Sequence, residues 1–268
     1  MTKLARMARH TALIGAHVDS ADPLDAAAAA GAEAIQFFLG DPQSWKKPVE
    51  HQFADELRET DLAIYIHAPY LVNVASANNK IRIPSRKIMQ QHAEAAADIG
   101  ARGLVVHGGH VSSNEDPKVG IDNWRKVFER AEETGGFPLP ILIENTAGGE
   151  NAMARKFDRL AMLWDAVGDY QPGFVLDTCH AWAGGEELLD IVDRVMAITG
   201  RIDLVHANNS RDAFDSGADR HANFDAGTFD SELIAAVCRD AGCDVIIETP
   251  AEGHLTDLAF LRKRLREN

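Results

Sequence analysis

Cysteine is scarce in this sequence, and none of the three residues Cys179, Cys238 and Cys243 belongs to a Cys-x-x-Cys pair. An odd number of isolated cysteines argues against a disulfide framework or a thiolate zinc site, and it indicates a reducing compartment. No apolar run approaches the ~18 residues that a membrane span needs, and the N-terminus lacks the apolar core of a signal peptide. We therefore expect a cytoplasmic protein that has no membrane partner.

Nucleotide-binding loops are also missing. The chain contains no G-x-x-x-x-G-K-[ST] motif and no G-x-G-x-x-G after a strand-like segment. Both motifs hold phosphates on glycine-rich backbone, so their absence argues against a nucleotide cofactor of these classes.

Positive charge is in deficit, since 27 Lys and Arg stand against 41 Asp and Glu, a formal net charge of −14. Taken alone, this argues against a nucleic-acid partner, whose phosphates are bound by Lys and Arg. The charge is unevenly distributed, however. Residues 62–93 contain no Asp or Glu but carry Lys80, Arg82, Arg86 and Lys87. Bound metal ions would add positive charge that a formal count omits, so a cationic face on an acidic protein is consistent with the sequence.

Eight short apolar segments have the composition of β-strands, and a helical pattern follows nearly every one. Two of them end near His17 and Gln36. The other six end in a histidine or a carboxylate, at His67, His107, Glu144, Asp177, His206 and Glu248. This alternation predicts a parallel sheet with crossover helices, and about 250 residues is the usual length of a (β/α)₈ barrel. We therefore predict an α/β fold with one TIM-barrel domain over residues 1–268, in which the strand ends converge on one open face.

Start and stop signals predict several helices. Asp22 is a favoured N-cap, Pro23 a favoured first residue and Gly31 a favoured C-terminal stop. Pro84 is likewise expected to begin a helix, and a further helical pattern covers residues 186–198.

Five of the strand ends point to metal binding by their residue types. His67, His107 and His206 end different strands on one rim, and neutral imidazole is a natural zinc ligand. Glu144 and Glu248 end apolar strands with no basic residue nearby in sequence. A buried lone carboxylate costs several kcal/mol unless it is paired or metal-bound, so metal ligation is favoured over an ion pair.

Two loops contribute further candidate ligands. Asp177 and His180 are three residues apart where a strand ends, and they could serve adjacent metals. Asp219 and His221 lie on the same side of an extended segment because side chains alternate with period two. Arg220 between them would point elsewhere and could reach a phosphate.

The order and surroundings of these residues resemble the endonuclease IV family of apurinic/apyrimidinic (AP) endonucleases, and actinobacterial members are the most similar. The matching stretches are GAHV at 15–18, HAPYLVNVAS at 67–76, HGGH at 107–110, ENTAG at 144–148, LDTCHAWAGG at 176–185, HANNSRD at 206–212, DRH at 219–221 and ET at 248–249. They span nearly the whole chain and are jointly specific.

The resemblance implies a barrel with three zinc ions that hydrolyses the phosphodiester 5′ to an abasic site in double-stranded DNA. The product would carry a 3′-hydroxyl, and blocked 3′ ends would also be trimmed. By position it implies three sets of zinc ligands: His67, His107 and Glu144; Glu144, Asp177, His206 and Glu248; and His180, Asp219 and His221. Glu144 would bridge two ions and be the catalytic residue. We expect a monomer.

The resemblance implies two DNA contacts, and the distribution of basic residues in the sequence predicts three more. Tyr70 and Leu71 match residues that enter the DNA at the lesion, and Arg82, Arg86 and Arg220 are expected to contact DNA.

Some positions depart from the family pattern. Asn209 stands where many members have Asp, and Asp225-Ala226 replaces a Gly-Glu pair. The loop 40–45 lacks the basic residue that some members insert into DNA. These changes concern rate and loop geometry more than metal binding.

Two other functions fit parts of the sequence. A sugar isomerase or epimerase on the same barrel also holds metal with Glu, Asp and His, but it usually needs one or two ions, which would leave Asp219 and His221 without a role. A non-catalytic lesion-binding protein is suggested by Asn209 and Ala226, and the intact ligand set argues against it.

Overall fold

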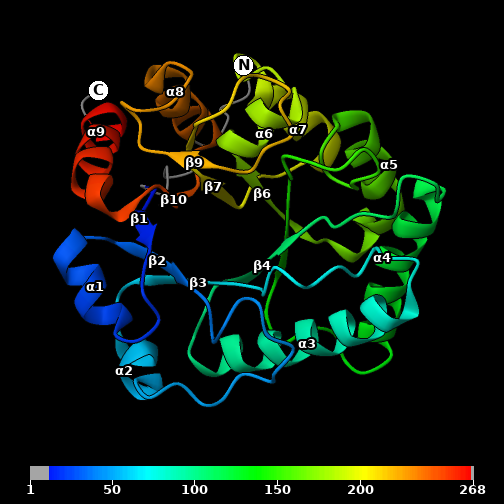
Figure 1. Cartoon of the computed structure of the whole chain (residues 1–268). Helices are drawn as coiled ribbons and strands as arrows, with labels where there is room; N and C mark the ends of the chain where they lie inside the picture. The colour runs from blue at the N-terminus through cyan, green and yellow to red at the C-terminus, as the bar shows by residue number, and fades with distance from the viewer. Residues whose placement is uncertain (1–11, 267–268) are drawn as a thin grey trace, which may run out of the picture.

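The computed structural model describes residues 12–266, which form a closed barrel of eight parallel strands with helices around it (Figure 1). The barrel strands are β1 Ile14–His17, β2 Ala34–Phe37, β3 Ala63–His67, β4 Gly103–His107, β5 Ile141–Glu144, β6 Gly173–Asp177, β7 Leu204–His206 and β10 Asp244–Ile247. Each strand pairs with its neighbours in the chain, and β10 closes the sheet against β1. The predicted single-domain TIM barrel is confirmed.

The helices surround the strands. They are α1 Pro23–Ala30, α2 Ala54–Glu59, α3 Asn79–Asp98, α4 Pro117–Glu132, α5 Phe157–Val167, α6 Thr178–Gly184, α7 Ile191–Thr199, α8 Ser231–Ala241 and α9 His254–Arg266. Short 3₁₀ turns occur at Gly168–Tyr170 and Ala251–Gly253. The long connection after β7 contains a small antiparallel pair, β8 Asn209–Ser210 and β9 His221–Ala222. Within residues 12–266, no helix has the length and apolar character that crossing a membrane requires.

The helix boundaries confirm one prediction and correct two others. Asp22 caps α1 by accepting from Asp25 N, Pro23 is its first residue, and Gly31 ends it at φ +59°, where glycine avoids a Cβ clash. Pro84, in contrast, lies inside α3, because Asn78 caps that helix by accepting from Lys80 N.

The helix predicted over residues 186–198 begins later than expected. Gly185, at φ +82°, ends the short helix α6, and α7 starts only at Ile191. A left-handed glycine terminates one helix, and the chain needs several residues to turn before the next begins.

The barrel interior is filled by apolar side chains from the strands. These residues form a cluster of their own, separate from the larger core: Ala34, Ala63, Tyr65, Val105, Leu142, Val175, Leu204 and Ile246. Each of these residues lies two or four positions before a polar residue, and that polar residue is at the end of the strand or next to its end. Because strand side chains alternate between faces with period two, those polar side chains also point toward the barrel axis.

The larger apolar core lies between the barrel and the helices. Trp124 of α4 is fully buried there, and its indole N–H donates to the carbonyl of Gly108 at 2.7 Å. This bond holds the start of the loop that follows His107, so packing of a surrounding helix also fixes the rim of the barrel.

Candidate metal centre

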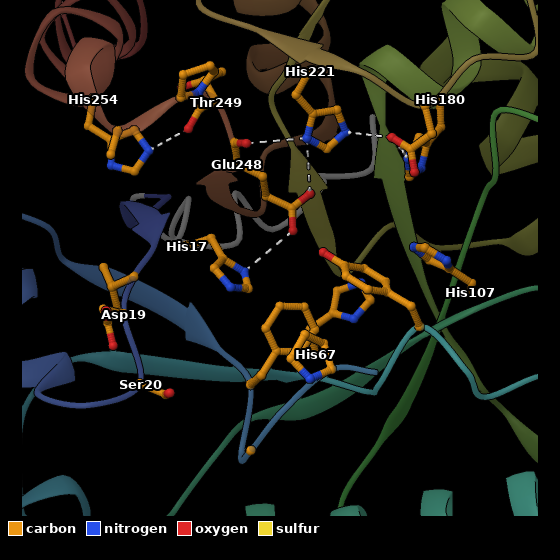
Figure 2. Close-up of a pocket in the computed structure, with 18 of the residues that line it drawn as sticks. His17, Asp19, Ser20, His67, His107, His180, His221, Glu248, Thr249 and His254 are labelled. Atoms are coloured by element: carbon orange, nitrogen blue, oxygen red, sulfur yellow. Dashed lines mark hydrogen bonds and ion pairs between the residues drawn. The ribbon is translucent and has the colours of Figure 1, made fainter. Parts of the chain in front are cut away.

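A cavity of about 970 Å³ opens at the carboxyl ends of the barrel strands. Figure 2 shows His67, His107, His180, His221 and Glu248 directed into it from several elements. Barrel folds carry their functional residues at this face.

Glu144 lies at the centre of the cluster and is completely buried. Its Oε2 is 3.3 Å from Nε2 of His67 and 3.3 Å from Nε2 of His107. Its Oε1 is 2.9 Å from Nδ1 of His206. The two carboxylate oxygens therefore face different imidazoles, as a bridging carboxylate requires.

The register of the sheet creates this arrangement. His107 is paired with Glu144 across β4 and β5, and Asp177 is paired with His206 across β6 and β7. Glu248 follows β10 directly, and its Oε2 is 3.2 Å from His206 Nδ1.

The third group comes from loops. Nε2 of His180 is 3.0 Å from Oδ1 of Asp219, and Nε2 of His221 is 3.4 Å from the same oxygen. The side chains of Asp219 and His221 therefore lie together, with His221 at the start of β9. Nε2 of His221 is also 3.5 Å from Asp177 Oδ2, which joins this group to the strand-end cluster.

Each of the three groups implied by the resemblance brings its donor atoms within 4.8 Å of one another. A fourth combination, Asp177, Cys179 and His221, meets the same distance. Burial raises the pKa of the Cys179 thiol to about 12, which disfavours the thiolate that binds metal.

The donor set fits zinc on two observations. Four-coordinate zinc with bonds of ~2.0–2.1 Å places its ligand atoms ~3.3 Å apart, close to the separations seen around Glu144 and Asp219. In addition, Nε2 of His180 and Nε2 of His221 are buried and make no hydrogen bond, although carboxylate oxygens lie near them. Buried nitrogens without a hydrogen bond are rare, and metal ligation would satisfy them.

The outward nitrogens of the rings support the same interpretation. His67 Nδ1 lies 2.7 Å from the carbonyl of Ala68, and His180 Nδ1 lies 2.9 Å from the carbonyl of Asn145. His206 Nε2 lies 2.9 Å from Oε1 of Gln36. In each ring the N–H faces an acceptor, which leaves the lone pair of the other nitrogen directed into the cluster.

The charges in the cluster are strongly coupled. Burial alone would raise the pKa of Glu144, but His206 and His107 bring it well below its usual range. Burial raises the pKa of Asp177, despite the opposing effect of His180 and His221. Burial would lower the pKa of His206, but Glu248 and Glu144 raise it well above its usual range. The carboxylates therefore favour positive charge between them.

Three amide side chains hold Asp177 and Glu248 in place through their carboxylates or their backbone, and the sequence interpretation gave these amides no role. Asn208 Nδ2 donates to Asp177 Oδ2 at 2.7 Å, and its Oδ1 accepts from Glu248 N at 2.7 Å. Gln36 Nε2 donates to Glu248 Oε1 at 2.6 Å. Asn145 Oδ1 accepts from the backbone N–H of Asp177 at 2.7 Å. The signal available for Asn145 and Asn208 was their position within two residues of a strand-end ligand, and for Gln36 it was its own position near a strand end.

The predicted DNA-contact residues occupy different settings. Tyr70 is 57% exposed and lines the cavity, where its ring contacts Phe38 and His107. Leu71 follows it and is half-buried. Burial, followed by the charges of nearby carboxylates, raises the pKa of Tyr70 to about 12, so its hydroxyl stays neutral.

The three arginines that are predicted to contact DNA differ in their contacts with the rest of the protein. Arg82 donates to the carbonyls of Ser76 and Ala77, so it also supports the loop before α3. Arg86 lies close enough to Arg82 and to an arginine of α4 for burial and these charges to lower its pKa. Arg220 is exposed but pairs with Asp212.

Among the described residues, Arg211 is the only Lys or Arg that lines the cavity. It belongs to one of the matching stretches, but the sequence interpretation gave it no role. Its Nε donates to the carbonyl of His221 at 2.9 Å, so a cation stands beside the third group of ligands.

The departures from the family pattern have structural settings. Asn209 is fully buried, and its Nδ2 donates to the carbonyls of Phe224 and Phe229, which closes the long connection after β7. A Cβ on Gly227 would lie 1.9 Å from the Asn209 side chain, so glycine is needed there. Asp225 and Ala226 are exposed on the same connection.

The chain is similar to known proteins over most of its length. A family model described as a xylose isomerase-like TIM barrel matches residues 24–264. A protein from Mycobacterium marinum named probable endonuclease 4 is 57% identical over 253 residues, which cover 94% of this chain and 99% of the relative. Its namesake from Mycobacterium tuberculosis is 56% identical over 252 residues, covering 94% and 98%.

Solved structures of other proteins are also similar to this chain. Endonuclease IV from Thermus thermophilus has a TM-score of 0.80 and 28% identity, and the match covers 96% of this chain and 100% of that chain. A D-tagatose 3-epimerase-like protein has a TM-score of 0.77 at 16% identity, covering 95% and 97%. The second likeness is one of fold alone.

Proposed function

The chain belongs to the endonuclease IV family of hydrolytic nucleases, and on that premise we propose that it cleaves double-stranded DNA 5′ to abasic sites with three zinc ions. The cut would leave a 3′-hydroxyl. The same site would remove blocking groups from 3′ ends, because such a group is also joined to the DNA through a phosphoester.

One observation carries the proposal. Glu144 is buried between imidazoles on both of its oxygens, inside a rim where three groups of donors converge. A single-metal sugar isomerase would not need the third group, which includes Asp219 and His221. The epimerase likeness rests on fold, whereas the endonuclease relatives match at high identity over nearly the whole chain.

Nine residues would hold the three ions. His67, His107 and Glu144 would hold the first, Glu144, Asp177, His206 and Glu248 the second, and His180, Asp219 and His221 the third. Zinc held there would supply positive charge for the phosphoryl oxygens and would lower the pKa of the attacking water.

Side chains of the protein orient the metal ligands and select the substrate. Gln36, Asn145 and Asn208 fix the carboxylates through the hydrogen bonds described above, which keeps the donor atoms in place before substrate binds. Tyr70 lines the cavity and Leu71 follows it in the chain, and the two side chains would fill the space of a missing base. A paired base is costly to flip out, so selectivity for abasic sites follows from access to the cavity.

The test is cleavage of a duplex that contains one tetrahydrofuran abasic analogue. The expected product is a nick 5′ to the lesion with a 3′-hydroxyl, and the undamaged duplex should survive. The analogue cannot undergo β-elimination, so a nick must be hydrolytic. Chelation should abolish cleavage and added zinc should restore it. An intact analogue after incubation with zinc-loaded protein would overturn the proposal.

Removal of 3′ blocks needs its own substrate. A primer–template with a 3′-phosphate should become extendable by a DNA polymerase after incubation with the zinc-loaded protein. If the primer stays blocked while the abasic duplex is cut, the trimming activity is not present.

A further inference from the structure

His17 lies at the end of β1, outside the nine proposed metal ligands, and it was not assigned a role from its residue type or position. It lines the cavity, and its side chain is 21% exposed. The ring packs on Phe38 with centroids 4.8 Å apart. Figure 2 shows the His17 ring next to the Glu248 carboxylate.

The tautomer of His17 can be deduced from Gln36. Gln36 Nε2 is 2.6 Å from Glu248 Oε1, and an ionised carboxylate can only accept, so the amide nitrogen must be on that side. The opposite orientation would bring two oxygens together. At the other end, Oε1 accepts from His206 Nε2 at 2.9 Å, which agrees with the same assignment.

The same Gln36 nitrogen lies 3.0 Å from His17 Nδ1. Because this amide nitrogen is a donor, Nδ1 is the accepting nitrogen of the ring, and Nε2 is the nitrogen that carries a proton. Both polar contacts of the ring are at Nδ1, and within residues 12–266 no side chain or backbone group bonds to His17 Nε2. A hydrogen-bond donor of fixed tautomer is thus left without a partner in a residue that lines the cavity.

We propose that His17 is a substrate-binding residue whose imidazole donates from Nε2–H to a non-bridging oxygen of the phosphodiester. This inference rests on the proposed function. His17 Nδ1 is 3.6 Å from Glu248 Oε1, so the ring adjoins the cluster where the phosphate must bind. The carboxylates there repel an anion, and Nε2–H supplies a favourable dipole whose direction is set by Gln36. Negative charge on these oxygens grows during attack, so the bond is strongest in the transition state.

Three substitutions separate the donor from the packing. His17→Phe keeps a ring against Phe38 but has no donor. His17→Asn places an amide near the position of Nδ1, where it can still contact Gln36, but it does not reach the position of Nε2. His17→Gln places an amide N–H near the position of Nε2.

With the tetrahydrofuran duplex, His17→Phe and His17→Asn should lower kcat/KM about 100-fold, mainly through kcat, which is the usual effect of losing one such donor. His17→Gln should stay within about tenfold of the wild type. Zinc content should be the same in all four proteins. Wild-type rates in His17→Asn, or equal losses in His17→Asn and His17→Gln, would overturn the proposal.

A measurement on the wild type needs no variant. With ¹⁵N-labelled histidine, the free zinc-loaded protein should show His17 protonated at Nε2 and unprotonated at Nδ1, and addition of the nicked product duplex should shift the Nε2–H proton downfield. A proton on Nδ1, or an unmoved Nε2–H signal in the saturated complex, would refute the role of His17. Failure of the wild type to cut the analogue would instead refute the proposed function, so the two failures are distinguishable.

Discussion

His92 offers a quantitative test of how burial affects this protein. It lies in α3 and is 2% exposed, and its Nδ1 makes no hydrogen bond. Burial lowers its pKa from 6.5 to about 4. No neighbouring charge contributes to that shift, so the effect is one of desolvation. His92→Leu replaces the ring with an apolar side chain of similar size and removes the titration.

The sign and size of the effect follow from proton linkage. Folded His92 takes up its proton only below about pH 4, whereas the unfolded chain takes it up below about pH 6.5. Between these values the unfolded state holds more protons, so wild-type stability falls as the pH falls. The loss is near zero at pH 7.5, about 2 kcal/mol at pH 5 and about 3 kcal/mol below pH 4.

The assay is thermal or urea unfolding of both proteins at pH 7.5 and pH 5. On acidification, the stability of His92→Leu relative to the wild type should rise by about 2 kcal/mol, or roughly 4 °C in Tm for a chain of this length. Other groups, including the metal cluster, titrate in both proteins and cancel in the difference. A difference that is independent of pH would show that His92 is solvated or paired, and the reasoning would be wrong.

Three further predictions concern the site. Elemental analysis of the purified protein should find close to three zinc equivalents, and a reproducible value near one would favour the isomerase alternative. Glu144→Ala should lower abasic-site cleavage by several orders of magnitude without unfolding the barrel, whereas Glu150→Ala, an exposed carboxylate on the same loop, should cut normally; near-normal cleavage by folded Glu144→Ala would remove Glu144 from the mechanism. Arg86→Glu should weaken duplex binding and reduce its salt dependence by about one unit of slope, while Lys118→Glu on α4 serves as control. Arg86 is chosen because Arg82 also holds the loop carbonyls, and an unchanged slope would mean that Arg86 faces away from DNA.

The sequence by itself determined the barrel and most of the candidate site. Strand ends are local features, since a run of apolar residues closed by His67 or Glu144 is visible in a few letters. Period-two alternation then directs such side chains to the axis without knowledge of any distant contact. The cap at Asp22 was predictable for the same reason, because a cap depends on neighbours three residues away.

Local signals failed where a more distant or competing contact decided. Pro84 lies inside α3 because Asn78, six residues earlier, supplied the cap. Arg220 stays a predicted phosphate contact, and the β8–β9 pair also brings its guanidinium to Asp212.

Only the tertiary structure decided which donors meet and what orients them. Strand register places His107 beside Glu144, and no pattern in either strand specifies that pairing. The bond between Gln36 and His206 joins residues 170 positions apart, and it is this network that fixes the proton of His17. The amino-acid sequence shows which side chains can bind a metal or donate a hydrogen bond. Distances between strand ends depend on how the sheet closes, because the closure sets every register at once.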